Sequence, residues 1–267
     1  MDETGLREAL KGLPIPDLRY LPVTGSTNDD AMAWLAEGAP DGALVIADQQ
    51  TRGRGRLNRS WHTPPGAALA FSLILRPTEE EASHLAQFTA LPSLALVDVL
   101  GGHYGLPVEI KWPNDVLLRR KKAAGVLNEV SWNEDRLNGL VQGVGINLAP
   151  DSVPAGGEQL YPPTCVEAEL GRPVDRVDFL ARVLAALFAW RVHLGQPRLL
   201  EAWNRHLAFC GQVVAVRSPG RPAERGTVLG VEPSGQLRLA LENGGEHLVA
   251  AGDVTLRPIE NSQVGES

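Results

Sequence analysis

Apolar residues recur at spacings of three and four along the stretch from Asp178 to Leu194. They are Leu180, Val183, Leu184, Leu187, Trp190 and Leu194. This spacing is the period of an α-helix that buries one face, so it predicts a helix over residues 178–194. A shorter helix from Arg198 to about Leu207 is expected to follow.

The first part of the chain combines short apolar runs with one clear helix start. Ser26 or Thr27 can cap a helix that runs to about Glu37, because both side chains suit an N-cap. The apolar runs around this helix predict strands over residues 19–23, 43–48 and 67–75.

A second helix start lies near residue 78. Thr78 and Glu81 have the spacing of a capping box. They predict a helical region that extends to about Leu100. Pro92 is expected to kink or split it, because proline lacks the backbone donor of a helix interior.

Turn residues divide most of the remaining chain into short strand-like runs. In the middle of the chain the expected strands are residues 108–111, 116–118, 125–130 and 137–148. After residue 210 they are residues 213–217, 227–231, 237–241, 247–250 and 254–256. A short helix over residues 166–170 should end at Gly171.

The order of these elements indicates the fold class. Strands and helices do not alternate regularly, which favours an α+β fold with a mainly antiparallel mixed sheet. The closely spaced strands after residue 210 predict a small β-barrel. We therefore expect a larger domain over residues 1–210 and a small one over residues 211–267.

Composition narrows the range of protein classes to which the chain can belong. The chain has 267 residues, 43% of them hydrophobic, and a formal net charge of −7, which argues against a general nucleic-acid binder. Cys165 and Cys210 form no C-x-x-C pair and are expected to be buried thiols, although one disulfide stays open. Residues 1–16 do not resemble a signal peptide, and no run of about 18 apolar residues occurs. A soluble, cytoplasmic protein is predicted.

The segment from Gln50 to Trp61 concentrates four arginines and two glycines in an otherwise acidic chain. Glycines let backbone amides approach a ligand, and guanidinium groups bind carboxylate and phosphate oxygens. An oxygen-rich anion is therefore the expected ligand. The alternatives are a solvated arginine-rich turn and an RNA-binding RGG-like tail. No Gly-Lys-Ser or Gly-Lys-Thr follows, so this is not a Walker P-loop.

Three further segments carry candidate chemistry. Lys111–Asp115 places a lysine at a strand end and a carboxylate after the turn, where Asp115 can accept a proton or help to hold a metal. Residues 121–127 set two lysines before an apolar strand, and residues 143–147 place glycines inside a strand. Each pattern taken alone also fits an ordinary turn or strand.

Together these segments resemble the biotin protein ligase family in order and spacing, over about residues 19–258. The resemblance implies a class II aminoacyl-tRNA-synthetase-like catalytic domain followed by an SH3-like barrel. It also implies an enzyme that uses ATP and Mg²⁺ to form biotinyl-5'-AMP. Biotin would then be transferred to a lysine of a biotin carboxyl carrier protein, such as an acetyl-CoA carboxylase subunit.

The resemblance also assigns roles to residues. The biotin-binding set is Ser26, Thr27, Gln50, Gly53, Arg54, Trp61, Lys122, Gly125, Leu127, Gly143 and Gly145. The ATP- or adenylate-binding set is Arg54, Arg56, Arg59, Lys111, Asn114 and Asn147. The catalytic set is Lys122, Arg56, Asp115 and Lys111. The ligands of the metal stay open. Arg52 and Asn58 depart from the family pattern, which usually has small residues there.

Proteins related to this family have other functions, and one sequence feature argues against each of them here. Family members that repress transcription carry an N-terminal helix-turn-helix, for which residues 1–16 are too short, so no DNA binding is expected. Lipoate ligases share the fold, but the segment 50–61 and the turn 111–115 favour biotin. Homodimers are common in the family, and the sequence does not establish one here.

Overall fold

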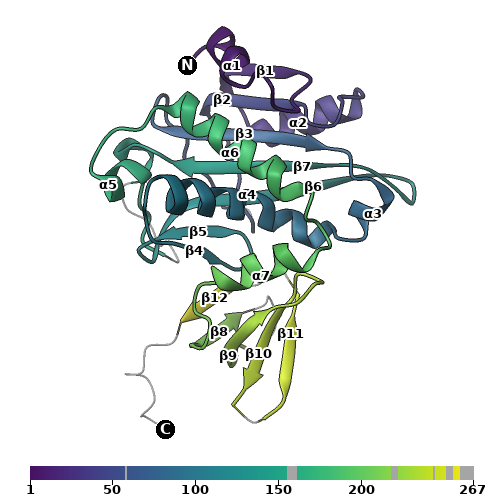
Figure 1. The fold of residues 1–267 in the computed structure, drawn as a ribbon, viewed down its shortest axis with the longest axis vertical. Coiled ribbons are helices and arrows are strands. Elements are labelled where there is room, and N and C mark those ends of the chain that lie inside the picture. Colours follow the sequence, from purple (N-terminus) through teal and green to yellow (C-terminus); the bar gives the residue numbers. More distant parts are fainter. Residues whose placement is uncertain (58, 155–160, 218–221, 243, 251–254, 259–267) are drawn as a thin grey trace.

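The computed structural model describes residues 1–57, 59–154, 161–217, 222–242, 244–250 and 255–258. Its larger part is a seven-stranded sheet with the order β1-β2-β3-β7-β6-β5-β4 (Figure 1). The strands are β1 Leu18–Thr24, β2 Leu44–Gln50, β3 Ala68–Leu75, β4 Val108–Lys111, β5 Asp115–Leu118, β6 Lys121–Asn133 and β7 Arg136–Asn147. Only β1 and β2 pair in parallel. The prediction of a mainly antiparallel mixed sheet is confirmed.

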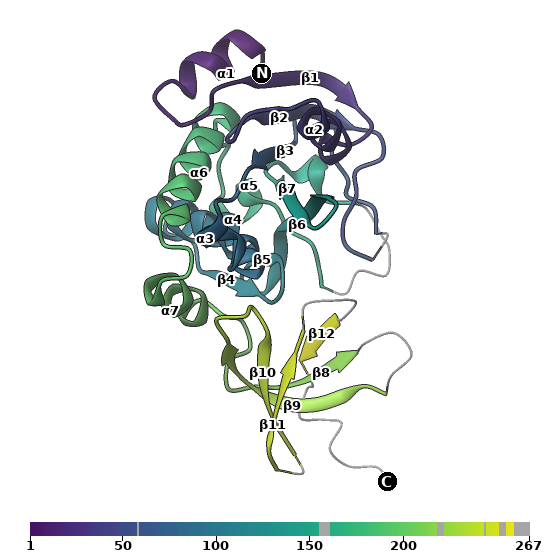
Figure 2. The same cartoon turned by 90° about the vertical axis from the view of Figure 1, so that its right-hand side faces the viewer.

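Helices cover the two faces of this sheet unequally. One face is packed by α1 Glu3–Ala9, α4 Ala90–Leu96 and α6 Arg176–Arg191, which share the main hydrophobic core with the sheet (Figure 2). The opposite face carries α2 Thr27–Ala36, whose Trp34 and Leu35 pack on β2, β3 and β7 in a smaller core. The remainder of this second face lines the cavity described below.

The helix predicted from its three- and four-residue spacing is present as α6. Asp175 caps it by accepting hydrogen bonds from the backbone of Val177 and Asp178. The helices α7 Pro197–Arg205 and α5 Val166–Leu170 also match their predictions, and Gly171 ends α5 with a left-handed φ of 75°. The short α1 had no expected counterpart in the sequence pattern.

The helical region after residue 78 is divided, but not at Pro92. The capping box opens α3 Glu79–Ala82, and a 3₁₀ helix Leu85–Thr89, α4 and a π-helical stretch Val97–His103 follow. Pro92 lies inside α4, where it removes the donor that would bond the Phe88 carbonyl. The side-chain amide of Gln142 donates to that carbonyl instead, at 2.6 Å, so the helix continues through the proline.

Among the described residues, Leu85–His103 is long and apolar enough to cross a membrane by length and composition alone. Its most apolar window is 67% buried inside the protein. It packs between α6 and the large sheet. Its place is that of a core helix.

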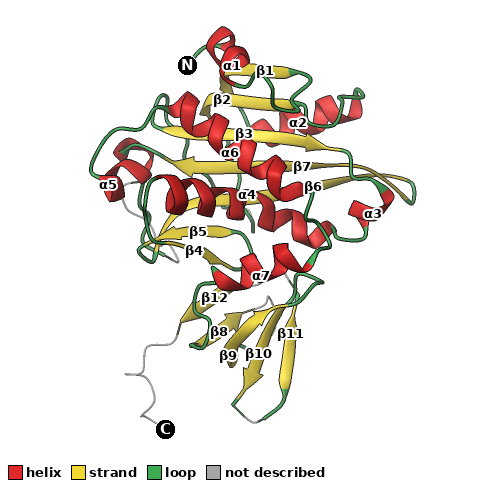
Figure 3. Cartoon of the chain, viewed as in Figure 1, coloured by secondary structure: helices red, strands yellow, loops and turns green. Residues whose placement is uncertain are grey.

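A second, five-stranded antiparallel sheet follows α7, in the order β11-β10-β9-β8-β12 (Figure 3). The strands are β8 Val213–Arg217, β9 Glu224–Val231, β10 Leu237–Leu241, β11 Glu246–Val249 and β12 Thr255–Pro258. The expected small β-unit is therefore confirmed, although Val254 of the last predicted strand lies outside the described residues. A domain boundary at residues 210 and 211 stays a prediction.

Side-chain hydrogen bonds attach the small sheet to the rest of the protein. The indole nitrogen of Trp112, beside β4, donates to the carbonyl of Gly235 in the β9–β10 turn at 3.0 Å. The side chain of Asn204 in α7 bonds both the amide and the carbonyl of Val231. The small sheet is thus attached to the turn that carries Lys111 and Asp115.

The two cysteines are both free. Cys165 is buried as expected, but Cys210 is exposed, so the prediction of two buried thiols is wrong for Cys210. Cys210 lies in the connection between α7 and β8, directly after the buried residues Ala208 and Phe209.

Candidate active site

A cavity of about 670 Å³ lies on the sheet face that carries α2. The start of α2, the segment after β2, the β4–β5 turn, β6, β7 and the segment after β7 surround it. Of the predicted site residues, it is lined by Ser26, Thr27, Gln50, Arg54, Arg56, Arg59, Trp61, Lys111, Asn114, Asp115, Lys122, Gly125, Leu127, Gly143, Gly145 and Asn147. The cations predicted from distant segments therefore share one cavity. The individual binding roles stay predictions.

Gly53 is the predicted site residue that does not line this cavity. A β-carbon there would lie 2.4 Å from the carbonyl oxygen of Trp61. The Gly53 carbonyl also accepts a hydrogen bond from the Trp61 amide at 2.8 Å. In this structure the glycine lets the two sides of the segment 50–61 approach each other.

The start of α2 forms a polar end of the cavity. The backbone amide of Thr27 donates to Oε1 of Gln50 at 2.9 Å, and Nε2 of Gln50 donates to the hydroxyl of Thr63 at 3.0 Å. The side-chain orientation of Gln50 is therefore fixed before any ligand binds. Ser26 is the N-cap residue of α2, but its side chain makes no capping hydrogen bond, which leaves its hydroxyl for other contacts.

Trp61 lies against the glycines of the sheet. A β-carbon at Gly145 would lie 2.4 Å from the Trp61 ring, whereas one at Gly125 would meet it at an ordinary 3.4 Å. Only glycine at position 145 lets the ring lie this close to β7. The ammonium nitrogen of Lys122 lies 5.4 Å from the centre of the same ring, so the tryptophan and the lysine line neighbouring parts of the cavity wall.

Asp115 lies between two lysines that both line the cavity. Its carboxylate is 2.6 Å from Nζ of Lys122 and 3.4 Å from Nζ of Lys111. Burial raises the pKa of Asp115, but the two ammonium groups lower it by more than burial raises it. The net pKa is therefore below the ordinary value. Burial also lowers the pKa of Lys111, more than Asp115 raises it. The carboxylate is therefore held in its ionised form.

The arginine loop reaches across the cavity. The guanidinium of Arg56 donates to Oδ1 of Asn114 at 3.1 Å, and Nδ2 of Asn114 donates to the Val126 carbonyl at 2.8 Å. Nδ2 of Asn147 donates to the Thr164 carbonyl at 3.0 Å. The two asparagines of the predicted ATP- or adenylate-binding set are thus both oriented by the main chain.

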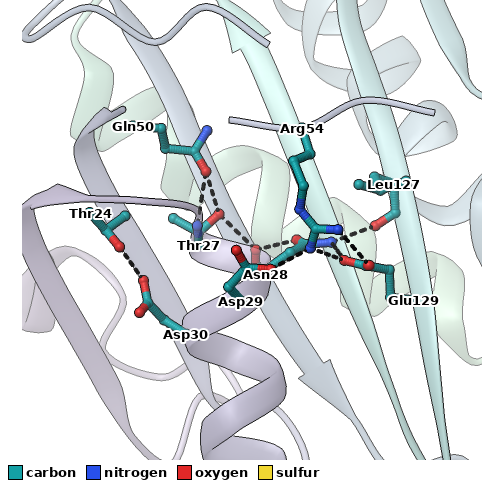
Figure 4. Close-up of polar contacts among 10 residues, drawn as sticks. Thr24, Thr27, Asn28, Asp29, Asp30, Gln50, Arg54, Leu127 and Glu129 are labelled. Carbon is teal, nitrogen blue, oxygen red and sulfur yellow. Dashed lines mark hydrogen bonds and ion pairs between the residues drawn. The ribbon is translucent and has the colours of Figure 1, made fainter. Parts of the chain in front are cut away.

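Arg54 bonds to acidic side chains of α2 and β6 (Figure 4). Arg52 is exposed and is not among the residues that line the cavity. Its backbone amide donates to the Gly25 carbonyl at 2.8 Å. Asn58 lies outside the described residues.

Sequence reasoning missed some side chains of the site. Asn28 lines the cavity directly after the predicted Ser26 and Thr27, and that adjacency was the available signal. Tyr161 also lines it, and its ring centre lies 5.0 Å from Nζ of Lys111. Tyr161 follows a proline- and glycine-rich stretch without periodicity, so no sequence pattern pointed to it.

No group of three or more His, Cys, Asp or Glu side chains able to hold a metal occurs among the residues that the structure describes. Asp115, the acidic side chain among the described residues that line the cavity, is already paired with Lys111 and Lys122. The protein side chains therefore do not fit a resident metal centre.

Comparison with protein families gives two matches. Residues 20–147 match the Biotin/lipoate A/B protein ligase family. Residues 209–257 match the Biotin protein ligase C terminal domain. The two matches cover both sheets of the structure, and the second is named for biotin protein ligases alone.

Individual relatives agree with the family matches. A biotin–[acetyl-CoA-carboxylase] ligase of Paracoccus denitrificans is 37% identical over 237 residues, covering 85% of this chain and 96% of the relative. A bifunctional ligase/repressor of Bacillus spizizenii is 32% identical, covering 88% and 72%. The structure of a biotin protein ligase from Aquifex aeolicus in complex with biotin and ATP matches with a TM-score of 0.78 and 27% identity, covering 92% and 100%. The chain therefore belongs to the biotin protein ligase family.

Proposed function

We propose that this chain is an ATP-dependent ligase that joins biotin to AMP and then transfers it to a lysine of a biotin carboxyl carrier protein. The observation that carries the proposal is the single cavity that combines Lys111, Lys122 and Arg56 with the polar pair Thr27 and Gln50. Family membership and the acetyl-CoA-carboxylase ligases among its relatives support the same activity.

In the first step, an oxygen of the biotin carboxylate attacks the α-phosphorus of ATP and pyrophosphate leaves. Two unit charges about 4 Å apart repel by about 4 kcal/mol at an effective dielectric constant of 20. Positive side chains fixed in place before the reaction offset this repulsion. Lys122, Lys111 and Arg56 are the proposed groups, and Arg59, which is exposed and also lines the cavity, adds a further charge near the phosphates.

The other end of the cavity is suited to a neutral, polar ring. Thr27, Gln50 and Ser26 offer hydroxyl and amide groups that can hydrogen-bond the ureido ring of biotin. Trp61 and Leu127 give apolar walls for its valeryl chain, and Gly125, Gly143 and Gly145 leave room along the sheet. In this arrangement the carboxylate of biotin would extend toward Lys122.

In the second step, a carrier lysine attacks the carbonyl carbon of the mixed anhydride, an amide forms and AMP leaves. The attacking amine must be neutral, but free lysine, with a pKa of about 10.4, is protonated at neutral pH. Asp115 is the proposed group that orients the incoming ammonium and receives its proton. Lys122 then stabilises the negative charge that develops on the carbonyl oxygen.

Mg²⁺ belongs to this proposal as part of the ATP substrate. The phosphate oxygens would supply most of its ligands, since the described acidic side chains near the site are paired with cations. Bound in this way, the metal would neutralise charge on the leaving pyrophosphate.

We further propose that the enzyme acts in the cytoplasm on a carrier protein and without binding DNA. The net charge of −7 opposes a nucleic-acid contact. A gel-shift assay with duplex DNA, with and without biotin and ATP, tests this part. A specific complex that requires both ligands would contradict it.

The decisive experiment incubates the chain with ATP, Mg²⁺, biotin and a biotin carboxyl carrier domain and measures the mass of the carrier. The expected result is one added biotinyl group, with pyrophosphate and AMP as products. A carrier whose acceptor lysine is replaced by arginine should stay unmodified. Lipoate in place of biotin tests the related activity, and transfer of lipoate alone would overturn the proposal.

A further inference from the structure

The side chain of Arg54 forms ion pairs with two carboxylates that do not line the cavity. Its NH1 donates to Oε1 of Glu129 at 3.1 Å, and its NH2 donates to Oε2 of Glu129 at 2.9 Å. NH2 also donates to Oδ1 of Asp29 at 2.5 Å. Figure 4 shows the guanidinium between the start of α2 and β6. Paired, charge-assisted bonds of this kind fix an arginine in position and orientation.

Glu129 connects this ion pair to the polar end of the cavity. Nδ2 of Asn28 donates to Oε2 of Glu129 at 2.7 Å and to the carbonyl of Leu127 at 3.2 Å (Figure 4). The same asparagine packs so closely on Gly143 that a β-carbon there would lie 2.0 Å from its Oδ1. The carboxylate of Glu129 therefore ties the arginine loop to residues that line the proposed biotin site.

At its base the loop is attached beside the start of α2, because the amides of Thr51 and Arg52 donate to the carbonyls of Thr24 and Gly25, and none of these bonds reaches the tip of the loop. Its internal bonds join Gly53 to Trp61 and Gly55 to Arg59, which keep the hairpin shape but do not hold it against the sheet. Arg56 reaches Asn114 at the opposite end. On the side of α2, the ion pairs that the structure describes between the loop and the rest of the protein are those of Arg54 with Glu129 and with Asp29.

We propose that Glu129 and Asp29 are positioning residues which, through Arg54, hold the loop closed over the biotin end of the cavity and slow the escape of biotin and biotinyl-adenylate. We call these three residues the Arg54 latch. The inference rests on the proposed function and adds a role for two acidic residues that do not line the cavity. It also changes the expected role of the Arg54 side chain from biotin and adenylate binding to loop closure.

The exposure of the latch determines how large and how salt-sensitive its effect should be. The side chains of Arg54, Asp29 and Glu129 are 42%, 53% and 28% exposed. Ion pairs at this exposure are weak and screened by salt, so we expect roughly a two- to tenfold effect on release rather than loss of the fold.

The test compares the wild-type chain with Glu129→Gln, Arg54→Gln and the double variant. The dissociation rates of biotin and of preformed biotinyl-adenylate are measured at low and high ionic strength. At low ionic strength each single variant should release both ligands roughly two- to tenfold faster, and the double variant should be no faster than the singles. High salt should raise the wild-type rate toward that of the variants and change the variants little.

Glu37→Gln is the matched control. Glu37 follows α2 and pairs with Arg19 at 3.4 Å, with side chains that are 63% and 45% exposed. The substitution removes a comparable surface ion pair at the end of α2 and does not contact the loop. The release rates of biotin and biotinyl-adenylate should therefore be unchanged. Asp29→Asn is a second probe of the latch that leaves the contact between Glu129 and Asn28 in place.

The outcomes separate this inference from the proposed function. If the wild-type chain forms no biotinyl-adenylate, the proposed function fails. If adenylate forms but Glu129→Gln, Arg54→Gln and Asp29→Asn all release it at the wild-type rate, the latch is wrong. The latch would also be wrong if the two single effects on the dissociation rate multiplied in the double variant. It would be wrong as well if Glu37→Gln released the ligands as fast as the latch variants do.

Discussion

The ammonium nitrogen of Lys122 lies 2.6 Å from Oδ1 of Asp115. The two residues come from adjacent antiparallel strands, and the irregular register between Val116 and Leu117 brings Lys122 back toward the start of β5. Lys111 approaches the other carboxylate oxygen at 3.4 Å. One carboxylate thus holds two cations of the proposed adenylation site in place.

Lys122→Ala should lower biotinyl-adenylate formation by roughly 10²- to 10³-fold, because it removes a fixed positive charge from the proposed site of phosphoryl attack. Pyrophosphate release in single-turnover experiments measures this step. Lys121→Ala is the matched control, since the neighbouring Lys121 side chain pairs with Glu169 at 3.1 Å and does not line the cavity. Pyrophosphate release near the wild-type rate in Lys122→Ala would refute its assigned role.

Arg56→Gly should let the intermediate escape from the enzyme. The change removes the bond from the loop to Asn114 on the nucleotide side of the cavity and adds backbone freedom to the loop. Chromatography of the reaction without carrier should then detect free biotinyl-adenylate in solution. Arg52→Ala, which alters an exposed arginine of the same loop, should retain the intermediate as the wild type does. An Arg56→Gly enzyme that releases no adenylate would count against this closure.

Asp115→Asn should reduce the free energy of unfolding at neutral pH but not in acid. Burial raises the pKa of Asp115, yet Lys122 and Lys111 lower it more, so its folded-state pKa is depressed. A depressed carboxyl pKa stabilises the fold above the unfolded-state value, about 3.9, and this stability is lost as the pH falls through the folded-state pKa. Urea unfolding at neutral and acidic pH measures the difference between the two proteins. A difference that stays constant into acid would contradict the ionised pair.

Gly145→Ala should weaken biotin binding by about 1–3 kcal/mol, because the added methyl group would lie 2.4 Å from the Trp61 ring and must displace it. Titration calorimetry with biotin measures the change. At Gly125 the same substitution meets the ring at 3.4 Å, so Gly125→Ala should leave Trp61 in place and cost less. Equal losses in the two variants would show that the approach of Trp61 to β7 is not what matters.

Trp112→Phe should lower the free energy of unfolding by about 1–3 kcal/mol. The indole nitrogen of Trp112 bonds the Gly235 carbonyl inside the contact between the two sheets, and phenylalanine would leave that carbonyl without its donor. Trp132→Phe is the control, because Trp132 is 57% exposed at the end of β6 and should change stability little. Chemical denaturation compares the two, and equal midpoints would contradict a stabilising contact.

The local elements followed from sequence because their causes are local. The period of α6, the capping box at Thr78 and the stop at Gly171 each depend on residues within a few positions of one another. Pro92 shows the limit of such rules. Its missing donor is compensated by Gln142, a residue of a distant strand, and no local pattern contains that contact.

By itself, the sequence determined which chemical groups the site has and the order in which they occur, since glycine, arginine, lysine and asparagine motifs are legible one segment at a time. Only the tertiary structure decided which of these groups meet. Asp115 lies between Lys111 and Lys122, while Arg54 turns to Glu129, 75 residues along the chain. The physical reason is that charge and hydrogen-bond energies depend on distances of a few ångströms. Strand register and the packing of α2 on the sheet fix those distances, and neither is encoded within a single segment.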